Sequence, residues 1–345
     1  MTIKPILACA IAALVASSAF AAEPMKWKAI GQPVATGLIQ SKVEQPFFEN
    51  FAERTGLPIQ IDYKPSDTTG IKDTEQLRVL KSGLFDVVSL RMSANSRDEP
   101  LLLGVDLVGL NPNYATGKKV ADAYFDTLDE RLQKQFRTKL LGVWPFGPQI
   151  MFCKKPVDSF AAIKGLKVRT YDQSLAQFVE SLGGIPVPIS FADTHQALSL
   201  GVIDCAITGP SSANSAGWPE AATHQVPLGV QMAFNGYAIS LKAWNQLDGE
   251  SQAKLTKAFK DLTDEIWTFS ESLYDDAIAC NMGAESCTTG KKYTLVNVEP
   301  TPADLAAVQN AVSTISLPNW ASVCDKVNPT CSSDWKSVVA PVVGM

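Results

Sequence analysis

The sequence has few of the residues from which hydrolytic and metal-dependent active sites are built. Only two histidines, His195 and His224, occur in 345 residues. A catalytic triad or a histidine-based metal site is therefore hard to assemble, because both need imidazole as base or ligand. The chain also lacks the motifs G-x-S-x-G, H-E-x-x-H, C-x-x-C, GxGxxG and the Walker loop. We therefore expect a protein that is not an enzyme and that uses no metal or cofactor.

Long apolar stretches are also missing, apart from a short one at the N-terminus. Residues 1–21 carry one Lys, an apolar run and the small-x-small motif AFA, which is typical of a cleaved signal peptide. We expect cleavage after Ala21, because Cys9 comes too early in this segment for a lipoprotein anchor. No later stretch reaches the roughly 20 apolar residues of a membrane span. The mature chain is thus expected to be a soluble protein of the periplasm.

Positive charge is not in excess. The chain has 30 Lys and Arg against 35 Asp and Glu, a net charge of −5, and removal of Lys4 with the leader makes it more negative by one unit. Nucleic-acid binders draw affinity from many cation–phosphate contacts, so we expect no nucleic-acid partner. The sequence also has no low-complexity tract and no heptad array, and about 320 mature residues suffice for two domains.

The sequence does contain two similarly built runs of alternating helix and strand. The segment VLKSGLFDVV at residues 79–88 resembles ALSLGVIDCA at residues 197–206, since each has a helix end, a Gly, an acidic residue and a strand. Helix–Gly–strand turns are common in α/β proteins, so this repeat alone proves little. The chain is expected to cross between the halves near Gly147 and to return near Gly236. Two crossings indicate hinged lobes with a cleft between them.

These patterns predict an α/β fold of two lobes with the ligand cleft between the lobes. Lobe I comprises residues 22–147 and 236–278, and lobe II comprises residues 148–235 and 279–345. Apolar residues recur at three- and four-residue steps over residues 249–282, which predicts a long helix. A helix of this length can span both lobes.

The most informative stretch, residues 164–210, has the pattern strand, helix, strand, helix, strand. Arg169 ends the first strand, and ligands bind at this edge of open α/β sheets. A guanidinium there can hold a carboxylate through two parallel hydrogen bonds, although an exposed Arg with a surface partner fits the same position. The motif KGLKVR at residues 164–169, followed by ALSLGVID at residues 197–204, resembles the solute-binding proteins of tripartite ATP-independent periplasmic (TRAP) transporters.

The resemblance implies a two-lobed fold like that of periplasmic binding proteins, a ligand site and membrane partners. It implies that Arg169 clamps a ligand carboxylate. A second Arg of some members is replaced here by Gln149, an Asn by Thr208, and a pocket aromatic corresponds to Phe191. The partners implied are a small integral membrane subunit and a large ion-coupled permease, with the binding protein acting as a monomer.

Further candidates come from position alone. Trp144 and Phe146 end a strand at the lobe junction, and Trp218 follows a Ser-rich loop that contains Ser211. Aromatic residues of this kind form either core or a ligand wall, and a Ser-rich loop either donates hydroxyls or is simply a loop. Arg91 holds in lobe I the position that Arg169 holds in lobe II, and we weigh a ligand contact equally against a pair with Asp98 or Glu99.

Only one cation, Arg169, is assigned to the site, and its expected neighbours are neutral or aromatic. This combination predicts that the ligand is a small organic acid with a single carboxylate. A 2-oxo or 2-hydroxy acid, aromatic acids included, should bind better than a C4-dicarboxylate, whose second charge would be desolvated without compensation. The alternatives are a periplasmic enzyme that acts on an organic acid and a sensor module that presents it to a receptor.

Six cysteines remain once Cys9 is removed with the leader. An even number in an exported protein favours disulfides. Two of the expected pairs, Cys280–Cys287 and Cys324–Cys331, would each close a short loop. The third, Cys153–Cys205, then follows by elimination. The sequence leaves other connectivities open.

Overall fold

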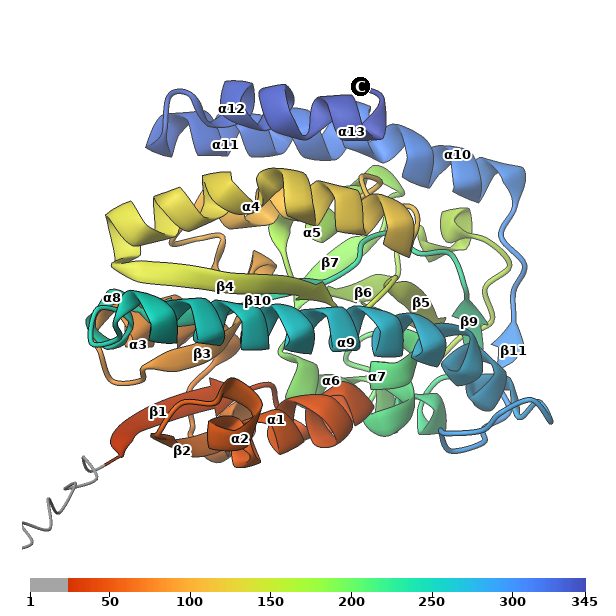
Figure 1. The fold of residues 1–345 in the computed structure, drawn as a ribbon. Coiled ribbons are helices and arrows are strands. Elements are labelled where there is room, and N and C mark those ends of the chain that lie inside the picture. The colour runs from red at the N-terminus through yellow and green to blue at the C-terminus, as the bar shows by residue number, and fades with distance from the viewer. Residues whose placement is uncertain (1–23) are drawn as a thin grey trace, which may run out of the picture.

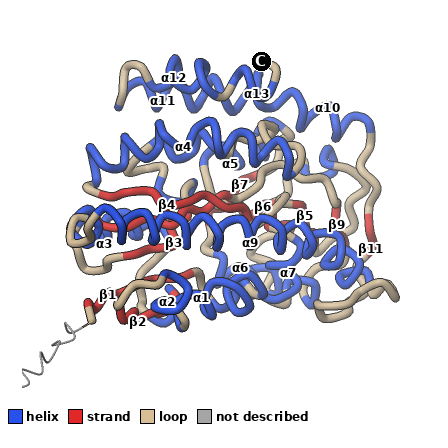
Figure 2. Tube along the Cα trace, viewed as in Figure 1, coloured by secondary structure: helices blue, strands red, loops and turns tan. Residues whose placement is uncertain are grey.

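The computed structural model describes residues 24–345, and the expected signal peptide with its cleavage site at Ala21 lies outside the described residues. Two mixed β-sheets, each covered by helices, form the two lobes (Figure 1). Figure 2 shows the strands in the interior of the molecule, with helices on the outside. The two-lobed α/β architecture predicted from the sequence is therefore confirmed.

The sheet of the first lobe has the strand order β2-β1-β3-β10-β4. Strand β10 is antiparallel to β3 and β4, because it belongs to the segment that returns from the second lobe. Gly236, where the return was expected, lies inside this strand. The strands are β1 (Met25–Gly31), β2 (Ile59–Pro65), β3 (Val87–Arg91), β4 (Thr138–Pro145) and β10 (Phe234–Ser240).

The sheet of the second lobe has the strand order β11-β9-β5-β8-β6-β7. The strand–helix–strand unit predicted for residues 164–210 forms one side of this sheet, with β7 at the edge and β6 parallel to both β7 and β8. The strands are β5 (Ile150–Cys153), β6 (Lys167–Thr170), β7 (Ile185–Pro188), β8 (Cys205–Thr208), β9 (His224–Val226) and β11 (Val296–Asn297).

The long helix α9 (Gly249–Met282) has the predicted bounds and runs along both lobes (Figure 1). It contacts β4 of the first lobe and α7 of the second. The carboxylate of Asp248 accepts a hydrogen bond from the backbone N–H of Ser251 and caps the first turn. Gly283 ends the helix with a positive φ of 74°, which a side chain would disfavour.

The remaining helices cover the faces of the two sheets. Helix α4 packs on β4 from the side opposite to α9 (Figure 1). The helices are α1 (Gln45–Glu49), α2 (Phe51–Thr55), α3 (Gln76–Lys81), α4 (Tyr114–Phe136), α5 (Gln173–Ser181), α6 (Phe191–Ser199), α7 (Pro210–Ser215), α8 (Leu241–Trp244), α10 (Pro302–Ala311), α11 (Leu317–Val327), α12 (Cys331–Val338) and α13 (Ala340–Val343).

The C-terminal helices differ from the expected assignment of residues 279–345 to lobe II. Helix α10 does pack on the second lobe, but α11, α12 and α13 pack on the first, over α4 and the 3-10 turn at Pro100–Val105. The indole N–H of Trp320 donates to the carbonyl of Pro100 at 2.8 Å, and that of Trp335 to Gly104 at 2.7 Å. These bonds satisfy both buried indoles, so the first lobe offers this segment polar partners as well as apolar surface.

All three expected disulfides are formed in the structure. The pair Cys153–Cys205 joins directly opposite residues of β5 and β8. The pair Cys280–Cys287 ties the end of α9 to the loop that follows, and the third pair joins α11 to α12. Within residues 24–345, none of the helices has the length and apolar character needed to cross a membrane.

Candidate ligand-binding site

Arg169 lies where the sequence predicts it, at the carboxyl end of β6, and is only 2% exposed. Its Nε donates to the carbonyl of Ile189 at 3.0 Å and its Nη1 to the carbonyl of Ile207 at 2.9 Å. Neither a carboxylate ion pair nor a hydrogen bond from Nη2 links it to any described residue. The guanidinium is thus held by neutral carbonyls and keeps one donor group, Nη2, free for an acceptor that residues 24–345 do not supply.

Aromatic rings and a second cation surround this guanidinium. Its centre lies 5.3 Å from the ring centroid of Tyr171 and 5.6 Å from that of Trp218. Burial, followed by the positive charge of Arg91, lowers the pKa of Arg169 to about 10. The carboxylates of Asp73 and Asp172 act on this charge from beyond ion-pair distance and offset only part of the lowering. The group therefore stays charged at neutral pH with no carboxylate among the described residues in direct contact, which favours the binding of an anion.

Arg91 reaches the same region from the first lobe. It ends β3, is largely buried, and its guanidinium lies 5.4 Å from the ring centroid of Phe146. The partners considered from the sequence are wrong, because Asp98 pairs with Arg78 and Glu99 with Arg131.

Arg91 instead approaches Asp73, with 3.8 Å between Nε and Oδ2. This contact leaves its charge partly compensated. The site thus holds two guanidinium groups, one from each lobe, where the sequence assigned only one.

The other predicted residues collect beside the arginines. Gln149 is buried just before β5, and its Nε2 donates to the carbonyl of Gly147 at 2.7 Å. That Nε2 lies 3.1 Å from the position of a Cβ at Gly209, so a side chain there would require the Gln149 amide to shift slightly. Thr208, the last residue of β8, precedes this glycine and pairs with Ile150.

The predicted aromatic residues form two contacting pairs. The ring centroids of Phe191 and Trp218 are 5.2 Å apart in the second lobe, and those of Trp144 and Phe146 are 5.0 Å apart at the edge of the first. Each pair has one member beside an arginine, Trp218 by Arg169 and Phe146 by Arg91. All four rings are buried in the hydrophobic core, and two of them also contact an arginine of the candidate site.

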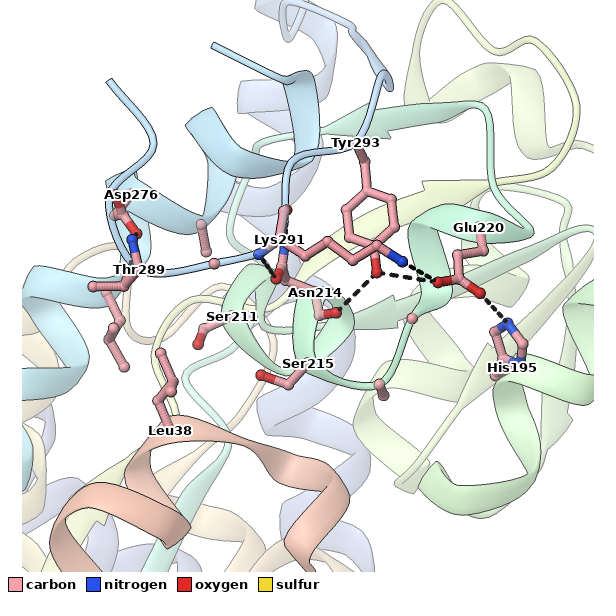
Figure 3. Close-up of a pocket in the computed structure, with 15 residues that line it drawn as sticks. Leu38, His195, Ser211, Asn214, Ser215, Glu220, Asp276, Thr289, Lys291 and Tyr293 are labelled. Carbon is pink, nitrogen blue, oxygen red and sulfur yellow. Dashed lines mark hydrogen bonds and ion pairs between the residues drawn. The ribbon is translucent and has the colours of Figure 1, made fainter. Parts of the chain in front are cut away.

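Ser211 is not brought together with the rest. It lines a separate cavity of about 590 Å³ between α7, α9 and the loop after α9 (Figure 3). The cation there, Lys291, is exposed and is paired with Glu220 at 2.7 Å. An exposed, paired cation has little need of a ligand, so we assign the ligand site to the buried arginines and not to this cavity.

Two further residues of the site were missed by sequence reasoning. The hydroxyl of Tyr171 and Oδ1 of Asn235 are buried atoms that lack a hydrogen-bond partner in the part of the chain that the structure describes. Tyr171 follows the KGLKVR motif by two residues, and Asn235 precedes the glycine of the returning strand. A polar residue within an otherwise apolar strand was the available signal for Asn235.

A buried carboxylate organises the return of the chain to the first lobe. Asp106 accepts hydrogen bonds from the backbone N–H groups of Met232 at 2.8 Å and Phe234 at 3.4 Å. Burial raises its pKa to about 7, and the nearby carboxylate of Asp172 adds to this rise. Residues 24–345 contain no group of three or more His, Cys, Asp and Glu that could hold a metal ion.

Comparisons with known proteins agree with the fold and the motif. The family model described as bacterial extracellular solute-binding protein, family 7, matches residues 31–316. The C4-dicarboxylate-binding periplasmic protein DctP of Rhodobacter capsulatus is 26% identical over 228 residues, which are 63% of this chain and 66% of that protein.

Two solved structures share the fold. A marine metagenome TRAP solute-binding protein specific for pyroglutamate has a TM-score of 0.80 at 23% identity, covering 94% of this chain and 100% of that one. DctP7 of Bordetella pertussis, an extracytoplasmic solute receptor binding pyroglutamic acid, has a TM-score of 0.79 at 18% identity, covering 90% and 99%. With the family model matching most of its length, this chain belongs to the bacterial extracellular solute-binding proteins of family 7, the binding proteins of TRAP transporters.

Proposed function

We propose that this protein captures a small organic monocarboxylate in the periplasm and delivers it to the small membrane subunit and the large ion-coupled permease of a TRAP transporter. The observation that carries this proposal is Arg169, a buried cation at a strand end that has no carboxylate within ion-pair distance among the described residues. A ligand carboxylate would supply the missing charge and the acceptor for Nη2.

The position of the two arginines favours a ligand that connects the lobes. Arg169 belongs to the second lobe and Arg91 to the first, and the charge of Arg91 lowers the pKa of Arg169. A carboxylate between them removes this repulsion, so binding would stabilise the arrangement in which the lobes meet. The ligand thereby acts as the link that a permease could sense.

The charge balance favours one carboxylate over two. Asp73 already compensates Arg91 in part, at 3.8 Å, so the region has less than two free positive charges. A second carboxylate would be desolvated without a full partner. The rings beside the arginines instead favour an apolar or ring-bearing body, such as an aryl- or alkyl-substituted 2-oxo or 2-hydroxy acid.

The names of the relatives include both a dicarboxylate and a monocarboxylate as ligand. The R. capsulatus relative is named for C4-dicarboxylates, whereas both structural relatives described above are named for pyroglutamate, a ring-bearing monocarboxylate. Each name describes that relative, so the ligand of this chain has to be measured.

The test is isothermal titration calorimetry of the purified mature protein with matched acids. Phenylpyruvate, phenyllactate, lactate and pyroglutamate should include a ligand at least tenfold tighter than succinate or malate, a difference of about 1.4 kcal/mol. A dicarboxylate that binds tenfold tighter than every monocarboxylate would contradict the proposal, and Arg91 would then be assigned the second carboxylate.

A further inference from the structure

Two carboxylates that the ligand site does not use meet where the lobes join. Asp106 belongs to the first lobe and Asp172 to the second, and the side-chain amide of Gln231 connects them. Its Nε2 donates to the backbone carbonyl of Asp106 at 2.5 Å and to Oδ2 of Asp172 at 3.1 Å. Among the described residues, neither carboxylate has a Lys, Arg or His within ion-pair distance. Two acidic groups thus share one region with no cation in direct contact.

The amide between them has an acceptor that lacks a hydrogen. Gln231 is fully buried, and its Oε1 has no donor among residues 24–345. A flipped amide would set this oxygen against the carbonyl of Asp106 and the carboxylate of Asp172, so the two bonds of Nε2 fix the orientation. A carboxylic acid has an O–H donor that a carboxylate lacks. A proton on the acidic pair would therefore supply the kind of group that is missing beside Gln231.

Tyr171 connects this pair to the arginines of the ligand site. It precedes Asp172 in the chain, and its ring centroid lies 5.3 Å from the guanidinium centre of Arg169. Burial raises the pKa of its phenol; two carboxylates add to this rise and two guanidinium groups oppose it, namely Asp106, Asp172, Arg91 and Arg169. All four charges therefore act on one side chain, so an anion held by the arginines lies within electrostatic range of the acidic pair.

The other charged groups leave the region short of positive charge once a ligand is bound. Asp73 faces Arg91 from the first lobe, with 3.8 Å between the nearest atoms. The two histidines lie elsewhere, His195 at the cavity of Figure 3 and His224 at the start of β9. A ligand carboxylate would thus join three carboxylates around two guanidinium groups. An added negative charge favours protonation of acids nearby.

The acidic pair can exchange a proton near neutral pH. Burial raises the pKa of Asp106 to about 7, and it also raises the pKa of Asp172. Because the two groups interact, they take up their protons as a pair. An arriving anion raises both pKa values further, so the liganded protein holds more protons than the free protein at the same pH.

We propose that capture of the ligand carboxylate is coupled to the uptake of a proton from the solvent by the pair Asp106 and Asp172. This inference rests on the proposed function and adds a second bound species to the same event. The proton converts one carboxylate of the pair to the acid, so the net charge of the site changes little on binding. Release of the ligand returns the proton to the solvent. The affinity for the ligand therefore falls as the pH rises.

An ordered water beside Gln231 is the competing explanation for the unpartnered Oε1. Such a water could donate one hydrogen to Oε1 and the other to a carboxylate. Both carboxylates would then stay ionised, whether or not a ligand is bound. The two explanations differ in a measurable respect, because only proton uptake makes the affinity depend on pH and the heat of binding depend on the buffer.

The first experiment uses the unaltered mature protein. Of phenylpyruvate, phenyllactate, lactate, pyroglutamate, succinate and malate, the acid that binds tightest is titrated at pH 7.5 in phosphate and in Tris, whose heats of ionisation differ. The difference in binding heat should correspond to an uptake of about one half to one proton per ligand. Between pH 6.5 and pH 8.5 the affinity should fall by about fivefold to a hundredfold, the upper limit for one proton.

The outcomes separate this inference from the proposed function. Binding without proton uptake, with the same affinity at both ends of the pH range, overturns the inference and leaves the proposed function standing. If none of the six acids binds at any pH in the range, the proposed function fails and the inference fails with it.

The second experiment assigns the proton to its residues. Asp106→Asn and Asp172→Asn should each reduce the uptake to less than about half, because the remaining carboxylate no longer meets a second negative charge. Glu44→Gln is the matched control, since Glu44 is also buried with a raised pKa but accepts hydrogen bonds from Tyr63 and Tyr237 within the first lobe. Its uptake should equal that of the wild type. Full uptake in both Asn variants, or loss of uptake in Glu44→Gln, overturns the assignment to the pair.

Discussion

At the scale of single residues, the protein holds Arg169 with carbonyl oxygens and not with a carboxylate. The carbonyls of Ile189 and Ile207 fix the plane of the guanidinium without neutralising it. A buried ion pair would fix the side chain equally well but would leave a ligand nothing to bind. The side chain is therefore oriented in advance, while its charge stays available.

Replacement of Arg169 should abolish ligand binding and leave the fold intact. Removing one partner of a buried ion pair costs about 3–5 kcal/mol, so Arg169→Ala should lower the affinity by at least a hundredfold. Arg169→Lys should fail as well, because an ammonium group cannot bond both carbonyls and the ligand in one plane. Calorimetry on variants with native circular dichroism measures this. Arg78→Ala, which removes an exposed arginine, is the control, and near-native affinity in Arg169→Ala would refute the role.

Asp106 should make the stability of the protein fall as the pH rises toward neutral. Its pKa is about 7 in the folded protein against an ordinary value of 3.8, so between these values the folded state binds more protons than the unfolded state. Stability is then lost with rising pH, at up to about 1.4 kcal/mol per pH unit.

Thermal melts at pH 5 and pH 8 should therefore show a smaller pH-dependent loss for Asp106→Asn than for the wild type. Glu44 and Asp172, whose pKa values burial also raises, remain in both proteins, so the difference between the two profiles reports Asp106 together with its coupling to Asp172. Identical profiles would mean that Asp106 is ionised throughout.

At the scale of elements, sequence patterns locate helices and strands better than they locate contacts. The recurrence of apolar residues over residues 249–282 predicts both ends of α9 correctly, and the KGLKVR motif correctly predicts Arg169 at the end of β6. The packing of α11–α13 could not be predicted, because an amphipathic helix shows which face is buried but not against which lobe. Asn235 was missed for a similar reason, since its role depends on its neighbours in β3 and β4.

The two short-range disulfides should differ in their effect on stability. Both join cysteines seven residues apart, so each lowers the chain entropy of the unfolded state by about the same amount, which stabilises the fold by roughly 2–3 kcal/mol. Cys324 and Cys331 lie in the main core, whereas the loop at Cys287 is also held by Asn214 and Asp276. Replacing both cysteines of a pair by Ser should therefore lower the melting temperature more for Cys324–Cys331. Neither pair is bonded to Arg169, so ligand affinity should stay unchanged in both variants. Equal melting temperatures, or a lower one for the Cys280–Cys287 variant, would contradict the predicted order.

At the scale of the whole molecule, the lobes are connected by α9, by the crossing segments and by direct contacts. The backbone N–H of Val108 donates to Ser174 Oγ at 3.0 Å, and Ser212 Oγ donates to the carbonyl of Thr36 at 3.4 Å. Hydrogen bonds of this kind can break and reform at small net cost, since water replaces the lost partner. A ligand that links Arg91 to Arg169 would thus increase the population of the closed state, in which the two lobes are in contact.

Arg91→Gln should uncouple binding from closure. The ligand would keep its contact with Arg169 but lose the charge of the first lobe, so we expect affinity to fall by about tenfold to a hundredfold, or about 1.4–2.8 kcal/mol. Small-angle X-ray scattering should show a smaller radius of gyration for the wild type at saturating ligand, and a weaker change for the variant at equal saturation. A variant that compacts as fully as the wild type would show that Arg91 has no part in closure.

The indole rings at the site also turn the protein into its own optical reporter. Of the seven tryptophans in the sequence, Trp218 lies 5.6 Å from the guanidinium centre of Arg169, and Trp144 is the strand neighbour of Asn235. A carboxylate that arrives at Arg169 changes the electric field across the Trp218 ring, and indole emission responds to that field. Ligand addition should therefore shift the emission of the wild type, and the shift should be smaller in Trp218→Phe, which retains Trp144. Candidate solutes can thus be screened by fluorescence without a label.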